Sequence, residues 1–245
     1  MDKSTILAIV QGLTEFLPVS SSGHLVIFNR VFSMKADLLF YTVLHLGTMF
    51  SLIVFFFKDI IKVLKNLDLL KKILIITLVT GAVGFVGEGF FESLFSYYKF
   101  VIVALFVNGL ILIFANRRIN AKEKSSPTYL DSLILGLTQS IAIIPGISRS
   151  GITISTLLFR GINKEEAFRF SFLASIPIIF GSFLFEIREG VSLSSLFKYG
   201  KAFILAFITG YLALLLLHLF IERARLDIFG YYCIIIAFLW LAVLS

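Results

Sequence analysis

The sequence is poor in charge and almost free of cysteine. Cys233 is the only cysteine in 245 residues, which excludes an intramolecular disulfide and a metal site built from several thiolates. Charged residues make up 15% of the chain, whereas ordinary soluble domains carry about 25%. Only four prolines are present, so a proline within an apolar segment is conspicuous. A chain with so little charge is not expected to fold as a water-soluble domain.

Apolar residues dominate instead. Hydrophobic residues account for 58% of the chain, with 28 phenylalanines and a mean hydropathy of +0.99. A membrane-spanning helix needs about 20 apolar residues, because it satisfies its own backbone hydrogen bonds without water. Six runs fit this description: residues 38–57, 73–90, 100–116, 168–187, 201–220 and 228–244. The sequence therefore predicts one all-α, polytopic membrane domain over residues 1–245.

The charge balance and the first residues narrow the function. Basic residues outnumber acidic ones by 22 to 15, which in a membrane protein indicates loops beside anionic lipid. We therefore expect membrane lipids, and no nucleic acid, as partners. Gln11 and Glu15 interrupt the first apolar stretch, and no small-residue cleavage pattern follows it. Residues 1–28 are therefore not expected to be a cleavable signal peptide.

Two more apolar segments are broken in the middle. In residues 6–28 the break is Pro18 with a serine-glycine cluster, and in residues 130–159 it is Pro145 with a second such cluster. A proline ends one helix, and serine or glycine after it can cap the next. Irregular backbone at membrane depth occurs only where protein buries it or where it lines a cavity. We interpret each segment as a re-entrant helical hairpin.

The two broken segments resemble each other. Gly12-Leu13-Thr14-Glu15 matches Gly136-Leu137-Thr138-Gln139, and Ser22-Gly23 matches Ser150-Gly151. Each hairpin is followed by three predicted spans. Because three is odd and a hairpin does not cross, the two hairpins must enter from opposite faces. This pattern predicts an inverted-topology repeat, with copies at about residues 4–118 and 128–245, whose broken segments meet near the midplane.

The basic residues also predict an orientation. They are about twice as frequent on the side that holds residues 58–72, 117–124, 160–169 and 223–225 as on the other side. The richer side is cytoplasmic by the positive-inside rule. Both termini and the mouth of the first hairpin are then expected on the outer face.

Glu15 is the first candidate for chemistry. A carboxylate in a membrane segment is costly and marks a functional site by default. Glu15 shares a helix face with Gln11, four residues earlier. It suits a hard divalent cation such as Mg²⁺ or Ca²⁺, which prefers oxygen ligands. The residues that follow add hydroxyls, a flexible turn and an imidazole: Ser20, Ser21, Ser22, Gly23 and His24.

The serine-glycine turns are candidate anion sites. Free N–H groups and the dipole at a helix start attract anions, and glycine permits close approach. Arg149 adds a guanidinium that can bind phosphate through two parallel hydrogen bonds. The expected phosphate-binding residues are Gln11, Ser20, Ser22, Gly23, Ser148, Ser150, Gly151 and Thr153.

Together these residues predict phosphoryl transfer, which needs positive charge, a cation, a nucleophile and an acid for the leaving group. The expected catalytic residues are Glu15, Ser21, His24 and Arg149. His24 could attack phosphorus or act as general base or acid, Ser21 could attack with His24 activating it, or water could attack. His45 could face this site as a partner of these residues rather than as a catalyst.

The order and spacing of the motifs resemble the undecaprenyl-diphosphate phosphatase family, also known for bacitracin resistance. The resemblance rests on residues 11–24 and 145–153 and extends along the chain, including residues 44–48 and 170–173. It implies a homodimeric lipid phosphatase of the bacterial plasma (inner) membrane. Such an enzyme uses a divalent cation, hydrolyses undecaprenyl diphosphate to undecaprenyl phosphate and inorganic phosphate, and so recycles the lipid carrier of cell-wall synthesis.

The family's functional residues carry over onto particular positions. Its acidic residue corresponds to Glu15, its serine to Ser21, its histidine to His24 and its phosphate-binding arginine to Arg149. The family allows glutamate or glutamine at the first motif position. Gln11 stands there in this chain, so a second carboxylate is absent and a metal site would depend on Glu15.

Two other functions compete with hydrolysis. Inverted repeats with broken helices are typical of transporters, so the chain could carry or flip a polyprenyl phosphate lipid. A scaffold without catalysis would leave two costly polar turns unexplained. The cluster of Glu15, Ser21, His24 and Arg149 favours hydrolysis, because a carrier needs no acid-base group beside its anion site.

Overall fold

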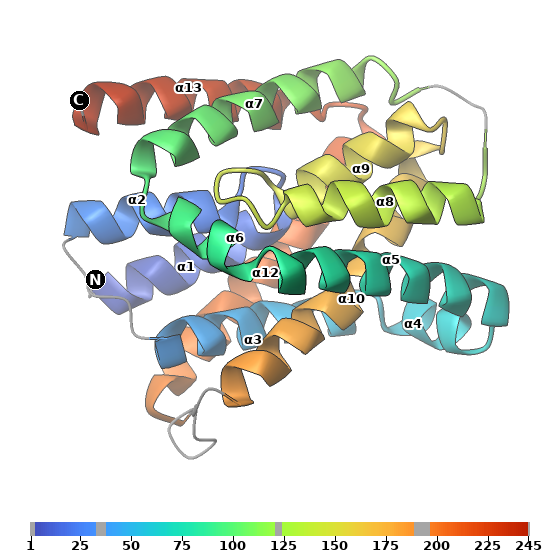
Figure 1. Ribbon diagram of the computed structural model, residues 1–245, viewed down its shortest axis with the longest axis horizontal. Helices are drawn as coiled ribbons and strands as arrows, with labels where there is room; N and C mark the ends of the chain where they lie inside the picture. The colour runs from blue at the N-terminus through green and yellow to red at the C-terminus, as the bar shows by residue number, and fades with distance from the viewer. Residues whose placement is uncertain (1–2, 33–37, 121–123, 189–196, 245) are drawn as a thin grey trace.

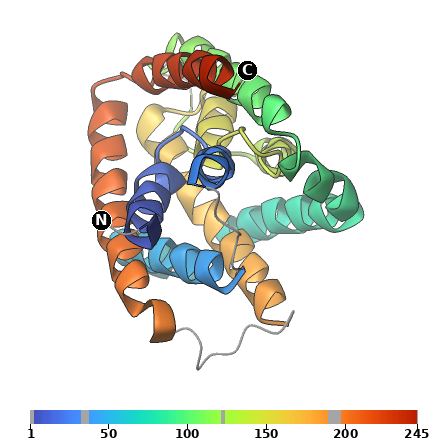
Figure 2. The ribbon, with the colours of Figure 1, turned by 90° about the vertical axis from the view of Figure 1, so that its left-hand side faces the viewer.

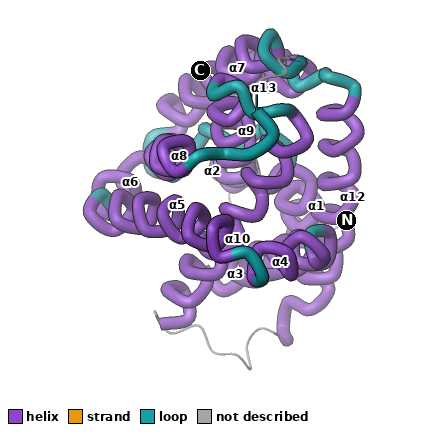
Figure 3. Tube along the Cα trace, turned by 90° about the vertical axis from the view of Figure 1, so that its right-hand side faces the viewer, coloured by secondary structure: helices purple, strands orange, loops and turns teal. Residues whose placement is uncertain are grey.

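The computed structural model describes residues 3–32, 38–120, 124–188 and 197–244, and helices make up nearly all of them (Figures 1 and 3). An isolated bridge between Lys124 and Ile162 is the one β-type pairing in these ranges. The helices are α1 (Lys3–Phe16), α2 (Ser21–Phe32), α3 (Leu38–Phe55), α4 (Phe57–Leu64), α5 (Leu67–Val86), α6 (Glu88–Phe95), α7 (Tyr98–Asn116), α8 (Tyr129–Ile141), α9 (Arg149–Phe159), α10 (Lys164–Arg188), the short 3₁₀ helix η1 (Phe197–Tyr199), α12 (Gly200–Glu222) and α13 (Asp227–Leu244).

The helices confirm an all-α, polytopic membrane protein. Within the described ranges, α5, α7, α10 and α12 are long and apolar enough to cross a membrane. A fifth crossing is present if α3 and α4, which meet at a 75° bend, count as one broken span. The sixth predicted run forms α13, an apolar helix just below the length of the other candidates. Four predicted runs lie within a single helix each (α7, α10, α12 and α13), whereas run 38–57 extends from α3 into α4 and run 73–90 from α5 into α6.

The first hairpin is formed by α1 and α2. Pro18 cannot donate a backbone hydrogen bond, and α1 ends two residues before it. Ser20 has a φ of 67°, in the left-handed region, which reverses the chain. Its hydroxyl then accepts a hydrogen bond of 3.3 Å from the backbone N–H of Gly23 and caps α2.

The second hairpin is formed by α8 and α9 in a similar way. Thr128 and Asp131 form a capping box at the start of α8. Gly146, with a φ of 100°, turns the chain after Pro145. The hydroxyl of Ser148 accepts a hydrogen bond of 3.2 Å from the N–H of Gly151, so the serine caps α9 as Ser20 caps α2.

The two halves of the chain pack into each other. Helix α1 packs on α12 and α8 packs on α5, while α7 and α13 run side by side (Figures 1 and 2). A Cβ added to Gly12 would meet Thr209 of α12, and one added to Gly136 would lie 2.8 Å from the Cβ of Val79 on α5. The matching glycines thus allow each hairpin to approach a helix of the other half.

This reciprocal packing supports the predicted repeat, whose boundaries and inverted topology stay predictions. The main core cluster draws on both halves, with fully buried Phe16, Leu52 and Leu112 beside Leu157 and Phe172. The described ends of the chain lie at the same side of the molecule, and α4 lies at the opposite side (Figure 1).

Candidate active site

The turns of the two hairpins meet inside the protein. A Cβ added to Gly23 would lie 3.1 Å from the Cα of Gly146, so the backbones are in close contact. Asn108 of α7 connects them, because its amide nitrogen donates to the carbonyl of Pro18 at 2.9 Å and its amide oxygen accepts from the N–H of Ser148 at 3.0 Å. This buried asparagine holds both turns at a fixed distance.

Glu15 and Arg149 form the centre of the site. The guanidinium Nη2 of Arg149 donates to Oε1 of Glu15 at 2.8 Å, across 134 positions of sequence. The other carboxylate oxygen accepts from the hydroxyl of Ser21 at 2.7 Å. The side chains of Glu15 and Arg149 are 8% and 18% exposed, so each charge depends on the other for compensation. An acid, a hydroxyl and a guanidinium from two hairpins are therefore in direct contact.

Gln11 and His45 extend this group. The amide nitrogen of Gln11 donates to Oε2 of Glu15 at 3.0 Å and lies 3.1 Å from Nδ1 of His45. Because an amide nitrogen can only donate, Nδ1 of His45 is the acceptor and its proton is on Nε2. Nδ1 also lies 3.8 Å from Oε2 of Glu15. The prediction that His45 could face the site is confirmed.

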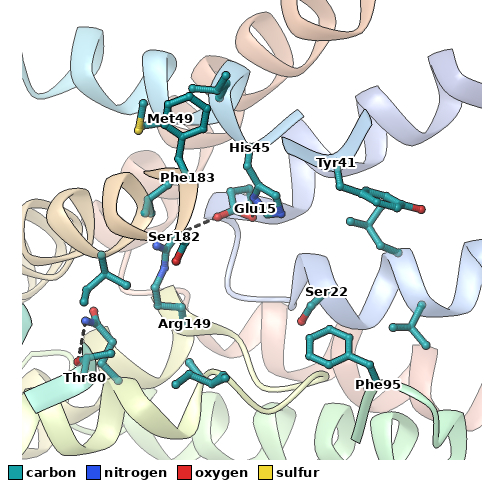
Figure 4. Close-up of a pocket in the computed structure, with 18 of the residues that line it drawn as sticks. Glu15, Ser22, Tyr41, His45, Met49, Thr80, Phe95, Arg149, Ser182 and Phe183 are labelled. Atoms are coloured by element: carbon teal, nitrogen blue, oxygen red, sulfur yellow. Dashed lines mark hydrogen bonds and ion pairs between the residues drawn. The ribbon is translucent and has the colours of Figure 1, made fainter. Parts of the chain in front are cut away.

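The group opens onto a cavity of about 680 Å³ (Figure 4). Glu15, Ser22, His45 and Arg149 line its polar part. Most of the remaining wall is apolar and comes from α2, α3, α6, α10 and the turn that follows α8: Leu25, Val26, Leu46, Met49, Phe95, Ala142, Ile143, Ile178, Ile179 and Phe183. Such a cavity suits a ligand with one charged end and a hydrocarbon body.

His24 lies elsewhere. Its Nδ1 is 2.8 Å from the carbonyl of Ser20, and its Nε2 is 2.9 Å from the hydroxyl of Tyr232 on α13. A carbonyl only accepts, so Nδ1 carries the proton and Nε2 accepts from the tyrosine. The ring is 4% exposed and is not among the residues that line the cavity. A catalytic role for His24 stays a prediction. In the structure its ring contacts the carbonyl of Ser20 and Tyr232 of α13 rather than the cavity.

The other predicted phosphate-binding residues build the turns rather than the cavity wall. Ser148 and Ser150 are buried, and their hydroxyls lie 3.1 Å apart. The hydroxyl of Thr153 donates to the carbonyl of Arg149 at 2.7 Å and lies 2.5 Å from that of Ser171. A Cβ added to Gly151 would lie 3.1 to 3.3 Å from atoms of Ser148, Asn108 and Pro18, so a side chain there would be tightly crowded. These residues position Arg149, and a direct contact with phosphate stays a prediction for them.

Sequence reasoning missed Asn108, Tyr232, Thr80 and the cavity position of Gln139. Asn108 is fully buried in an otherwise apolar helix, and a lone amide in such a helix is the signal that could have identified it. Gln139 was noted only as part of the repeated motif. Tyr232 carried no signal, because a tyrosine in an apolar span is ordinary at a membrane interface.

The donors for a divalent cation are few. The described residues contain no group of three histidine, cysteine, aspartate or glutamate side chains that could hold a metal. Glu15 is the one carboxylate among the residues that line the cavity. The buried amide oxygen of Gln11 has no hydrogen-bond partner and lies on the residue that contacts Glu15. One carboxylate and an unpaired carbonyl oxygen fit a cation such as Mg²⁺, which keeps several waters and binds substrate phosphates.

Fold and site together define a class: an all-α polytopic membrane protein with a buried glutamate–arginine pair at the polar end of a mostly apolar cavity. In a comparison with known protein families, residues 4–239 match the family described as bacitracin resistance protein BacA. The chain belongs to this family.

Named relatives cover nearly the same length. The chain is 38% identical over 240 residues to an undecaprenyl-diphosphatase of Methanococcus vannielii, covering 94% of this chain and 95% of the relative. It is 39% identical to one of Thermosipho africanus, covering 95% and 96%, and 37% identical to one of Carboxydothermus hydrogenoformans, covering 94% and 92%. The resemblance inferred from the two motifs is thereby confirmed.

Proposed function

We propose that this protein is an integral-membrane phosphatase that hydrolyses undecaprenyl diphosphate to undecaprenyl phosphate and inorganic phosphate. The family match and the names of the relatives support the reaction. The observation that carries the proposal is the contact of Arg149 with Glu15 at the polar end of an apolar cavity, with the hydroxyl of Ser21 donating to the same carboxylate. A lipid diphosphate has the same division into a charged head and a hydrocarbon tail.

Arg149 binds the terminal phosphate in this mechanism. Its guanidinium carries a permanent charge and can place two N–H groups on phosphate oxygens. The carboxylate of Glu15 accepts a hydrogen bond from Nη2 of the same guanidinium. Arg149 therefore stabilises the negative charge that spreads over the equatorial oxygens during transfer.

Ser21 is the nucleophile that the contacts favour over His24 and water. Its hydroxyl already donates to Glu15, whereas His24 is engaged by Ser20 and Tyr232. Glu15 accepts the hydroxyl proton as Ser21 Oγ attacks the terminal phosphorus. The bond from that phosphorus to the bridging oxygen breaks, and undecaprenyl phosphate leaves. Water then attacks the phosphoserine: the bond from phosphorus to Ser21 Oγ breaks, Glu15 returns its proton to Oγ, and the water becomes part of the released inorganic phosphate, with its spare proton passing to solvent.

A divalent cation, Mg²⁺ or Ca²⁺, belongs to the proposal as well. Glu15 would hold it, with the amide oxygen of Gln11 as a nearby neutral donor. Bound there, the cation would supply additional positive charge for the diphosphate oxygens. His45 lines the cavity, and its Nδ1 would help to hold the amide nitrogen of Gln11 beside Glu15.

The cellular setting completes the proposal. The protein would lie in a bacterial plasma membrane as a homodimer among membrane lipids, with both termini and the mouth of the site on the outer face. There it would recycle the lipid carrier for peptidoglycan precursors and so confer bacitracin resistance. The excess of basic residues in the loops near residues 58–72 and 117–124 supports this orientation. No observation on the described residues favours a transporter or flippase.

The direct test is turnover by the purified protein. In detergent micelles with Mg²⁺, it should release inorganic phosphate from undecaprenyl diphosphate and leave undecaprenyl monophosphate intact. The released phosphate and the lipid product should appear in equal amounts. Absence of turnover under conditions where the protein is folded and metal is present would refute the proposal.

A further inference from the structure

The cavity has a second polar group that the catalytic residues do not use. Gln139 of α8 and Thr80 of α5 line the same cavity as Glu15 and Arg149. The amide nitrogen of Gln139 lies 3.1 Å from the hydroxyl of Thr80, which itself lies 3.1 Å from the carbonyl of Gly136. In Figure 4, Arg149 is seen between Thr80 and Glu15.

Gln139 is buried but incompletely paired. It is 1% exposed, and its amide oxygen has no hydrogen-bond partner among the described residues. A buried amide that lacks a partner costs free energy, so such a group in a cavity indicates a ligand. The Thr80 hydroxyl can either donate or accept. In the structure it donates to the carbonyl of Gly136 and accepts from the amide nitrogen of Gln139, which leaves the amide oxygen unpaired. If the hydroxyl donates to the amide oxygen instead, the amide is reversed and its N–H groups are free to donate to a ligand oxygen.

The position of Gln139 in the repeat is also informative. It corresponds to Glu15 in the matching motifs, so one half of the chain has a carboxylate where the other has a neutral amide of the same size. Two carboxylates around a diphosphate would repel its negative charge. A neutral amide avoids this repulsion and can donate to a phosphate oxygen.

We infer that Gln139, held by Thr80, binds the lipid-linked phosphate of the diphosphate while Arg149 binds the terminal one. This inference rests on the proposed function, because it assigns the second phosphate of the same substrate. It makes Gln139 a residue that selects a diphosphate over a monophosphate. Thr80 is a positioning residue, since it acts through the amide.

The test compares Gln139→Glu with Gln139→Leu in the purified protein. Glutamate keeps the size and can still accept from Thr80, but it adds a negative charge beside the phosphate. We expect kcat/KM for undecaprenyl diphosphate to fall about 100-fold or more in Gln139→Glu and about 10-fold in Gln139→Leu, mainly through KM. Thr80→Val should lose several-fold, and Thr80→Ser should recover most of that loss.

Each alternative role of Gln139 predicts a different order of kcat/KM for the two Gln139 variants. If Gln139 serves only packing, Gln139→Glu should be milder than Gln139→Leu. If it holds a cation, Gln139→Glu should stay active and require less Mg²⁺. Either result overturns the inference. Asn120→Asp, which adds the same charge at an exposed position outside the cavity, is the matched control and should keep wild-type kinetics.

A second measurement does not depend on turnover. Inorganic pyrophosphate with Mg²⁺ should raise the thermal unfolding temperature of the wild type and should not raise that of Gln139→Glu. An equal rise in both proteins refutes the inference. The two proposals fail separately: a wild type that releases no phosphate refutes the phosphatase, whereas an active wild type with an equally active Gln139→Glu refutes only the role of Gln139.

Discussion

The two hairpins share a backbone design and differ in chemistry. In each, a serine caps the second helix through the N–H of a glycine three residues later, at 3.3 Å in the first and 3.2 Å in the second. The first hairpin supplies Glu15 and Ser21, and the second supplies Arg149 and Gln139. Neither hairpin contains a complete site. The comparison teaches that similar backbone turns can carry different side chains, and that the opposite charges of Glu15 and Arg149 bring the two hairpins into direct contact.

The comparison also explains why the charged pair tolerates burial. A lone carboxylate or guanidinium in a membrane protein would be strongly unfavourable, while the pair compensates within one contact of 2.8 Å. The stability of each hairpin in the folded protein therefore depends on the charge that the other hairpin supplies. Removal of one charge disturbs folding and function together, so variants must separate these effects.

The largest expected effect comes from removing the guanidinium of the second hairpin. Arg149→Ala should lower kcat by about 1,000-fold or more, because the transferred phosphate loses its principal positive partner. Arg149→Lys should recover little, since an ammonium cannot form two parallel hydrogen bonds. Phosphate release by the purified protein measures both.

The control for this prediction removes the buried charges together. Glu15→Gln with Arg149→Met leaves no unpaired charge, so its thermal stability should exceed that of Arg149→Ala. It should nevertheless be inactive. Turnover at the wild-type rate in Arg149→Ala would show that the second hairpin does not bind the phosphate.

An effect of similar kind is expected for the acid of the first hairpin. Chelation should stop turnover, and Mg²⁺ or Ca²⁺ should restore it in the wild type. Glu15→Gln should remain inactive at every metal concentration, because it removes both the proposed cation ligand and the acceptor for Ser21. Phosphate release titrated with metal in wild type and variant is the measurement. Full activity in excess chelator would exclude a cation from the mechanism.

A smaller effect is expected where the hairpins are joined. Asn108→Leu removes the bonds to both turns and leaves the carbonyl of Pro18 and the N–H of Ser148 without this partner. The free energy of unfolding should fall by about 2 to 4 kcal/mol, from two buried groups at about 1 to 2 kcal/mol each. Denaturation in detergent measures the loss. Asn116→Leu, which removes a hydrogen bond to the backbone of Leu226 outside the turns, is the comparison and should cost less.

The prediction with the smallest expected effect on the protein concerns the side of the membrane that the first turn and the loop after α7 face. Single cysteines at Ser22, in the first turn, and at Asn120, in the loop after α7, are placed in a Cys233→Ser background. A membrane-impermeant thiol reagent on intact cells should label position 22 and spare position 120, because the basic loops predict the latter inside. Position 120 must become reactive once the cells are opened. The opposite pattern would reverse the orientation.

Local sequence predicted the elements with good accuracy. The break of the first hairpin, residues 17–20, contains Pro18, and the break of the second, residues 142–148, contains Pro145, as proline and capping residues dictate over a few positions. Low charge and long apolar runs determined a helical membrane protein, since only such segments satisfy their backbone in lipid. Glu15, Ser21 and Arg149 were predicted as site residues because charges and hydroxyl clusters are rare in apolar segments, and the structure brings the three side chains into contact.

Contacts between distant residues were decided by the tertiary structure alone. Packing brings Glu15 to Arg149, turns His24 towards Tyr232, and places Asn108 between both turns. It also puts Gln139 in the cavity while Ser148 and Ser150 remain in the turn. A sequence motif specifies which groups are near along the chain and how the backbone bends. The direction of each side chain and its partner depend on how whole helices fit against one another, which residues far away in the sequence control.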